Sequence, residues 1–428
     1  MHLNPVPSPR AAGRGLGRGV RRVLPALALV ASIAACTRDI NLLARDGSAG
    51  GAGADGADAV TPIDTSSTNP ACTGLGPPIV LPTNTGAPCA GALAATGHRF
   101  ALCSCQAMNA TARVRTDAYD SSNPSLTDEV AAAIGIGGDL VASAEVRAGG
   151  ALWVAGANGI SATNSIRTST SLRVGGPMVM RSDHADIGGD AFVNGNVTGD
   201  VRVSGALHVS PGVTVDGMVE ATMVDSTQPV TVASPCDCSA GFVDIAGAIA
   251  TAAAQNADAA IGLAPGALAS VTTPTQISLP CGSFSLSTIN ATAALTLIVR
   301  GRTLLAVDGD VTVRGGLAVQ LDPSAELDLL VGGQLIASGG GAFGASSAAA
   351  RFRVWIAGTN TIVFDDAPTV NAIIHAPAAW VNAASGLPLS GSLLARDVSI
   401  GADSTLHFDR AVLEGGAACN APAAAIVP

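Results

Sequence analysis

The chain has 428 residues, of which 48% are hydrophobic, only 3% are aromatic and 51 are glycine, and its formal net charge is −10. So acidic a chain is not expected to bind nucleic acid or to adhere to anionic lipid by charge. With so few aromatic residues, its core must be built from Val, Leu, Ile and Ala. Such a core suits narrow coils filled by small branched side chains.

Residues 1–35 have the features of an export signal. A basic region with four arginines at 14–22 precedes an apolar run at 23–33 that is too short to span a bilayer. The tetrad Ile33-Ala34-Ala35-Cys36 resembles the lipobox of bacterial lipoproteins, in which the cysteine is acylated and becomes the new N-terminus. This resemblance implies a membrane anchor at Cys36, and an ordinary signal peptide is the alternative. In the inner-membrane sorting pattern, an aspartate follows the acylated cysteine. Thr37 stands at this position instead, so we expect the protein to be anchored in the outer membrane of the cell envelope.

Residues 36–95 are predicted to form a flexible tether that carries a loop between Cys72 and Cys89. From 46 to 69 the chain is mostly Gly, Ala, Asp, Ser and Thr, which cannot bury enough apolar surface to fold alone. The string at 51–56 satisfies GxGxxG, but no strand precedes it and no amphipathic helix follows. We therefore predict no dinucleotide site here.

Residues 96–232 are predicted to form an N-terminal β-solenoid. The stretch 199–219 repeats a glycine-led unit of about six residues, with aliphatic pairs such as Val201 and Val203, or Leu207 and Val209. Side chains two apart on a strand share a face, so each pair points inward while Arg202 points outward. Short strands of this kind gain stability when successive units stack into a solenoid. A β-sandwich is the alternative, but its strands recur at longer spacing and bring more aromatics.

Residues 233–272 are predicted to form a cysteine-containing helical insert, followed by a C-terminal β-solenoid at 273–415 and a tail at 416–428. Phe242, Ile245 and Ile249 stand at helical spacing in an alanine-rich segment that Pro265-Gly266 closes. One helix with a narrow apolar stripe is expected to lie against the side of the solenoid or to cap one end. A helix that binds a membrane or a partner is the alternative.

The repeats also resemble known families. "GGDLVASAEVRAGGALWVAG" and "GGDAFVNGNVTG" resemble the bactofilin-like, polymer-forming β-helical proteins. "TLLAVDGDVTVRGG" and "AELDLLVGGQLIASG" resemble an uncharacterised β-solenoid domain that also occurs in pilus-assembly-associated envelope proteins and predicted lipoproteins. Together the matches cover about 100–412. The resemblance implies a right-handed parallel β-helix with a structural role, and it brings no catalytic residues.

Eight cysteines beyond Cys36 are candidates for disulfides, since an even number in an exported chain favours them. Cys72 and Cys89 are a plausible local pair. The two C-x-C units could instead offer four thiolates to zinc, although structural zinc sites more often use C-x₂-C. Pairing of either unit with Cys281 or Cys419 would join distant parts of the chain, and the sequence leaves the connectivity open. The candidates are Cys72, Cys89, Cys103, Cys105, Cys236, Cys238, Cys281 and Cys419.

Enzymatic chemistry is not predicted, and neither is a cofactor or a metal site. Carboxylates stand singly in expected turns, as at Asp190, Asp200 and Asp216, and the Asp365-Asp366 pair also resembles a turn. Histidines are scattered, and His375 and His407 are expected to be structural or solvated. We therefore expect a non-enzymatic, lipid-anchored envelope protein that presents a rigid solenoid as a scaffold or adhesive module, through self-association or through binding of an envelope or surface protein. The alternative is a carbohydrate-active or carbohydrate-binding β-helix.

Overall fold

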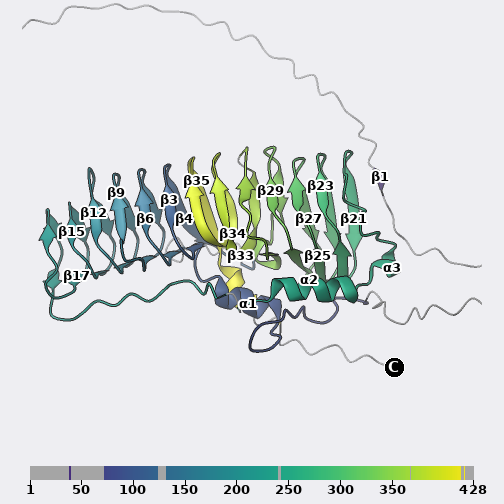
Figure 1. The fold of residues 1–428 in the computed structure, drawn as a ribbon, viewed down its shortest axis with the longest axis horizontal. Helices are drawn as coiled ribbons and strands as arrows, with labels where there is room; N and C mark the ends of the chain where they lie inside the picture. Colours follow the sequence, from purple (N-terminus) through teal and green to yellow (C-terminus); the bar gives the residue numbers. More distant parts are fainter. Residues whose placement is uncertain are drawn as a thin grey trace, which may run out of the picture. The chain divides into compact units, whose positions relative to one another are not determined.

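The computed structural model describes residues 38–39, 72–123, 132–239, 242–366, 368–415 and 419. Short parallel strands wind into a β-solenoid of about 14 turns, which confirms the predicted fold class (Figure 1). Cys36, the predicted signal peptide, the GxGxxG string and most of the predicted tether lie outside the described residues.

Two runs of strands make up the solenoid, which we call the N-half and the C-half. The N-half comprises β2 (Leu102–Ser104), β3 (Met108–Ala110), β4 (Val114–Tyr119), β5 (Ile134–Ile136), β6 (Leu140–Ala142), β7 (Val146–Ala148), β8 (Leu152–Val154), β9 (Ile160–Ala162), β10 (Ile166–Thr168), β11 (Leu172–Val174), β12 (Met178–Met180), β13 (Ala185–Ile187), β14 (Ala191–Val193), β15 (Val197–Thr198), β16 (Val201–Val203), β17 (Ala206–Val209), β18 (Val215–Asp216), β19 (Val219–Glu220) and β20 (Met223–Asp225).

The C-half comprises β21 (Thr275–Leu279), β22 (Gly282–Leu286), β23 (Ile289–Ala291), β24 (Leu295–Val299), β25 (Arg302–Val307), β26 (Val311–Val313), β27 (Leu317–Leu321), β28 (Glu326–Val331), β29 (Leu335–Ala337), β30 (Ala342–Gly344), β31 (Phe352–Ile356), β32 (Ile362–Phe364), β33 (Thr369–Ala383), β34 (Leu389–Ile400) and β35 (Ser404–Asp409). The remaining elements are β1 (Arg38–Asp39), the α-helices α1 (Ala90–Gly97), α2 (Ile245–Ala254) and α3 (Asp258–Ile261), and the 3₁₀ helices η2 (Ala349–Arg351) and η3 (Arg410–Glu414).

Most strands pair in parallel with the strand three places along, so the coils have three faces. We call the faces A, B and C after the strands β21, β22 and β23 that begin them. The coils of the N-half are short, as the pairing of Ala185 with Val201 shows. Those of the C-half are longer, as the pairing of Ile336 with Val363 shows. The longer coils provide wider faces.

The aliphatic pairs of the hexads point inward, as predicted. Val201, Val203, Leu207 and Val209 are each no more than 5% exposed, whereas Arg202 between the first pair is exposed. Burying such a side chain contributes roughly 1.5–3 kcal/mol, so the stacked rows of aliphatics supply most of the stability of the coil.

The two halves join in the middle of one solenoid, an arrangement that the chain order conceals. β35 pairs in parallel with β4, while β2 and β3 both pair with β34. One coil is therefore composite: β35 forms its face A, and β2 and β3 form its faces B and C. We call it the split coil. In Figure 1 the yellow strands of the C-half stand directly beside the blue strands that begin the N-half.

Face B of the C-half is covered by the segments that flank the halves. α2 packs on β22, β25 and β28, and its residues Ile245, Ala248, Ile249 and Ala252 are buried. The Asp244 carboxylate caps this helix by accepting a 2.9 Å hydrogen bond from the Gly247 amide. The helix therefore lies against the side of the solenoid, one of the two predicted positions.

Residues 72–97 also belong to this cover, which corrects the predicted extent of the tether. Leu81 and Ala90 are fully buried, and α1 lies at 90–97 beside η3. The sequence places this segment in the tether because its many prolines and glycines give no strand or helix period. Its apolar residues nevertheless find a surface on the C-half, a tertiary contact that local pattern does not reveal.

Candidate functional site

Four disulfides connect the cover to the solenoid and the two halves to each other. All eight predicted cysteines take part, with Cα–Cα separations between 5.4 and 6.0 Å. The pairs are Cys72–Cys281, Cys89–Cys419, Cys103–Cys236 and Cys105–Cys238.

The suggested local pair is wrong, and the zinc alternative to disulfides is excluded. Cys72 and Cys89 do not form a local pair, because Cys72 lies against Cys281 of the C-half while Cys89 begins α1 beside η3. The zinc alternative fails because the four sulfurs of the C-x-C units are bonded in two disulfides, Cys103–Cys236 and Cys105–Cys238. Neither unit bonds within itself, as expected for residues two apart.

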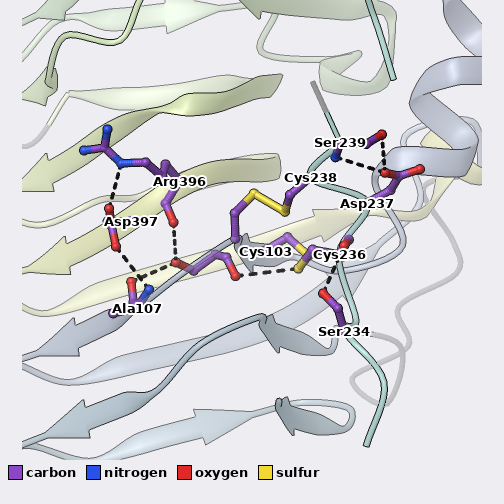
Figure 2. Close-up of a disulfide and its surroundings, with 11 residues drawn as sticks. Cys103, Ala107, Ser234, Cys236, Asp237, Cys238, Ser239, Arg396 and Asp397 are labelled. Atoms are coloured by element: carbon purple, nitrogen blue, oxygen red, sulfur yellow. Dashed lines mark hydrogen bonds and ion pairs between the residues drawn. A yellow bond between two sulfur atoms is a disulfide. The ribbon is translucent and has the colours of Figure 1, made fainter. Parts of the chain in front are cut away.

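The paired C-x-C units form a double crosslink at the split coil (Figure 2). One unit belongs to β2 and the turn after it, and the other lies on the segment that returns from the end of the N-half toward α2. A Cβ at Gly135, on the neighbouring β5, would stand 3.1 Å from Cys103 Sγ and 3.2 Å from Cys236 Sγ. Glycine at this position therefore leaves room for the crosslink.

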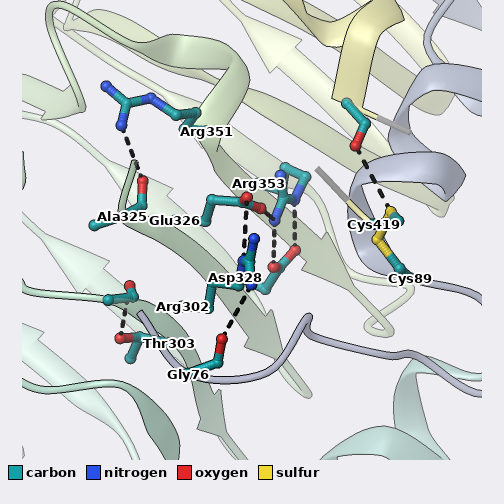
Figure 3. A network of polar contacts seen from close by, with 12 residues as sticks. Gly76, Cys89, Arg302, Thr303, Ala325, Glu326, Asp328, Arg351, Arg353 and Cys419 are labelled. Atoms are coloured by element: carbon teal, nitrogen blue, oxygen red, sulfur yellow. Dashed lines mark hydrogen bonds and ion pairs between the residues drawn. A yellow bond between two sulfur atoms is a disulfide. The ribbon is translucent and has the colours of Figure 1, made fainter. Parts of the chain in front are cut away.

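A buried network of ion pairs lies on face B beneath the cover (Figure 3). Arg353 donates hydrogen bonds of 2.8 and 2.7 Å to the two carboxylate oxygens of Asp328 and one of 2.6 Å to Glu326. Trp355 Nε1 donates a further 2.7 Å bond to Asp328. Asp328 is 0% exposed and Arg353 is 3% exposed. The two carboxylates hold the pKa of Arg353 above its usual range although burial alone would lower it.

This network gathers two carboxylates and an arginine, a cluster that the sequence does not reveal. Glu326 and Asp328 stand two residues apart, and Arg353 lies one coil later in the chain. Because the number of residues per coil varies along the C-half, the sequence does not show that Arg353 lies beside them. Because every one of these charges is paired inside the network, the arrangement is suited to holding β28 against β31. It offers no free carboxylate for acid–base chemistry.

The single carboxylates predicted in turns mostly accept backbone hydrogen bonds from the next coil. Asp190 Oδ1 accepts from the Ala206 amide at 2.9 Å, and Asp200 Oδ1 accepts from the Met218 amide at 2.9 Å. Asp216 lies exposed in the last full coil. The acidic pair before Pro368 also links coils, but in a different way: Asp365 Oδ1 accepts from the side-chain hydroxyl Ser385 Oγ at 2.8 Å, and Asp366 Oδ2 accepts from the Gly339 amide of the preceding coil at 3.3 Å.

The two histidines considered for chemistry have structural surroundings. His375 is 2% exposed and packs against Trp355, Phe242 and His98. Burial lowers the pKa of His375 to about 4, so its imidazole is neutral at pH 7. His407 lies on β35 and bonds Asp117 of β4, which raises the pKa of His407 and links the halves across the split coil.

The two ends of the solenoid differ. At the β21 end, the segment 257–271 runs along β22 and β23, with Leu268 O accepting from the Asn290 amide at 2.8 Å, and β1 pairs with β21. The inward residues of that first coil, such as Ile277, Phe284 and Ile289, are at most 3% exposed. The first coil is therefore capped.

At the other end no described segment covers the last coil. Val215, Val219 and Val224 continue the inward rows of the three faces, yet Val215 and Val219 are only partly buried and Val224 is 52% exposed. Met218 and Met223 beside them are 61% and 54% exposed. We call this apolar surface, formed by β18, β19 and β20, the open end.

Comparison with known proteins finds one family model, which is similar to the C-half and its covering helix. The family model described as a domain of unknown function, DUF7305, matches residues 242–414. This range includes α2, the C-half and η3, so the covering helix and the strands beneath it fall within one matched unit. No curated protein and no solved structure matches the chain significantly.

The described ranges contain neither a membrane-spanning helix nor a cluster of metal ligands. No helix there is long and apolar enough to cross a bilayer, α2 being only 10 residues long. Nor do three or more His, Cys, Asp or Glu side chains of this part gather where they could hold a metal ion.

Proposed function

We propose that the protein is a non-enzymatic component of the cell envelope that presents a rigid, disulfide-crosslinked β-solenoid as a structural scaffold. The observation that carries the proposal is the crosslinked split coil, which makes one framework from the two halves. Four disulfides favour an oxidising compartment outside the cytoplasm. The charged side chains beneath the cover, and most of those in the turns, serve to hold strands and coils together.

An acyl chain at Cys36 would hold this framework at a membrane, with each buried CH₂ group contributing roughly 0.8 kcal/mol. The absence of aspartate at position 37 favours the outer membrane. Replacing Cys36 by alanine in the full chain should release the protein from the membrane fraction. Full retention of the Cys36→Ala variant in that fraction would contradict the anchor.

The open end supports self-association as part of this function. It combines unpaired strand edges with apolar side chains, which together form a surface for a further coil. Because the opposite end is capped by the chain itself, two copies meeting at their open ends would use the same surface on both partners. Such an isologous contact closes at a dimer and does not extend into a filament.

Sedimentation velocity of the purified full chain should therefore show a concentration-dependent monomer and dimer, and no higher species. Val224→Asp, which places a charge in the inward row of the open end, should abolish the dimer. Val141→Asp is the matched control, because Val141 is equally exposed at 52% but lies on face C away from the end. A strict monomer at high concentration, or a dimer that survives Val224→Asp, would refute the end-to-end contact.

A further inference from the structure

An exposed tryptophan borders a shallow hollow on the outer surface of face C, beside the split coil. The hollow has a volume of about 360 Å³ and is lined mainly by Trp380, Asn109, Arg396, Asp397 and Ser399. These residues come from β33, β34 and β3, so the surface exists only because the two halves meet. The volume is near the lower limit of the roughly 300–1,000 Å³ typical of small-ligand sites.

Trp380 is held at the surface by its backbone. The pairing of β33 with β34 shifts register between Ala376 and Trp380, and such irregularities re-aim the side chains that follow them. The next residue, Val381, is fully buried and fixes the strand to the core. Trp380 is consequently 40% exposed, whereas Trp355 on face B is completely buried.

A row of polar side chains runs beside Trp380 across three successive strands. Asn382 pairs with Ser399, which pairs with Asn109 of the N-half, so the three stand at steps of about 4.8 Å along the solenoid axis. None of the three side chains has a hydrogen-bond partner among the described residues. Amide and hydroxyl groups both donate and accept, so the row can pair with hydroxyl groups of a ligand.

The charges at the hollow cancel each other and are fixed in place. Arg396 Nε lies 2.8 Å from Asp397 Oδ2, while Asp397 Oδ1 accepts a 3.1 Å hydrogen bond from the Ala107 amide (Figure 2). Arg396 also donates to the Ala378 carbonyl at 3.3 Å. A paired arginine and aspartate favour neither an anionic nor a cationic ligand, so the hollow is suited to an uncharged polar one.

We propose that this hollow binds an uncharged, β-1,4-linked oligosaccharide, with one pyranose stacked on Trp380. The apolar face of a pyranose fits an exposed indole, and its hydroxyl groups match the row of Asn382, Ser399 and Asn109. An extended β-1,4 chain advances per sugar by nearly the spacing between stacked strands, so it would lie along the solenoid axis. The proposal goes beyond the scaffold function and does not depend on it.

Isothermal titration of the full chain with chitohexaose and with cellohexaose tests the proposal. We expect at least one of the two to bind, and Trp380→Ala to weaken that binding about tenfold or more. Asn109→Ala should weaken it less. Polygalacturonate, a polyanion, should bind no better than the neutral probes.

Two controls separate binding from folding. Trp153→Phe changes a half-buried tryptophan on face B outside the hollow and should leave the affinity unchanged. Because Trp380 is exposed, Trp380→Ala should keep the circular dichroism spectrum and unfolding midpoint of the unmodified protein. Failure of both neutral hexasaccharides to bind at millimolar concentration, or binding that Trp380→Ala leaves intact, would overturn the proposal.

Discussion

Replacing all four cysteines of the double crosslink by alanine is expected to lower the free energy of unfolding by about 3 to 5 kcal/mol. Cys103–Cys236 and Cys105–Cys238 each have a sequence separation of 133. A crosslink over so long a loop removes much of the conformational entropy of the unfolded chain, which by the chain-entropy relation corresponds to about 5 kcal/mol. Chemical denaturation of the quadruple variant, followed by circular dichroism, measures the loss.

The two disulfides should be strongly non-additive. Each disulfide alone closes nearly the same long loop. Once one is formed, the other restricts the unfolded chain only by closing the short ring of residues between the two crosslinks. Removing Cys103 and Cys236 alone, or Cys105 and Cys238 alone, should cost only the entropy of that short ring, about 2 kcal/mol or less by the same relation, compared with about 5 kcal/mol for the long loop. Equal and additive losses from the two pairs would contradict this explanation, because they would mean that each disulfide acts through local contacts.

Arg353→Ala is expected to destabilise the protein by about 3 to 5 kcal/mol, an effect of similar size. The substitution removes three hydrogen bonds. Among the described residues, it leaves the Asp328 carboxylate, which is 0% exposed, with Trp355 Nε1 as its one side-chain donor. A buried carboxylate without a cation is costly because it has lost its hydration. The free energy of unfolding in urea at pH 7 measures this cost.

Arg300→Ala is the matched control for Arg353→Ala. The Arg300 side chain is 58% exposed and lies 3.8 Å from Asp322, so its loss should change the free energy of unfolding by about 1 kcal/mol or less. Replacing Glu326, Asp328 and Arg353 together by apolar residues of similar volume should restore most of the stability that Arg353→Ala loses. A triple variant as unstable as Arg353→Ala would contradict the view that the cost lies in the unpaired charge.

Much of the solenoid can be predicted from its hexads. Where only one side of a strand is buried, as at Val201 and Val203, alternation along the strand shows which residues form the core. The same reasoning weakens on face B of the C-half, where β31 is buried along its whole length. There the cover also buries the outward side chains, so Trp355 is as apolar as its inward neighbours, and within Phe352 to Ile356 only Arg353 marks the outer side.

The crosslinked split coil could not be predicted, because it depends on pairing between strands that lie far apart in the sequence. Nothing in the local pattern of Thr405 or Arg115 indicates that β35 and β4 are neighbours. The cysteine pairing follows from that arrangement. The sequence therefore indicates which eight cysteines form disulfides but not which cysteine pairs with which. The Trp380 hollow depends on it too, since Asn109 and Ser399 come from different halves.

An engineered disulfide tests the split coil most directly. Thr405 pairs in register with Arg115 across adjacent parallel strands, about 4.8 Å apart, which is within the range that a disulfide can span. The Thr405→Cys, Arg115→Cys protein should form this bond within one chain, detectable by mass spectrometry of non-reduced peptides. Thr405→Cys with Arg167→Cys, two coils further and about 14 Å away, should not crosslink. Crosslinking of the distant pair with none of the adjacent pair would show that the halves do not form one continuous solenoid.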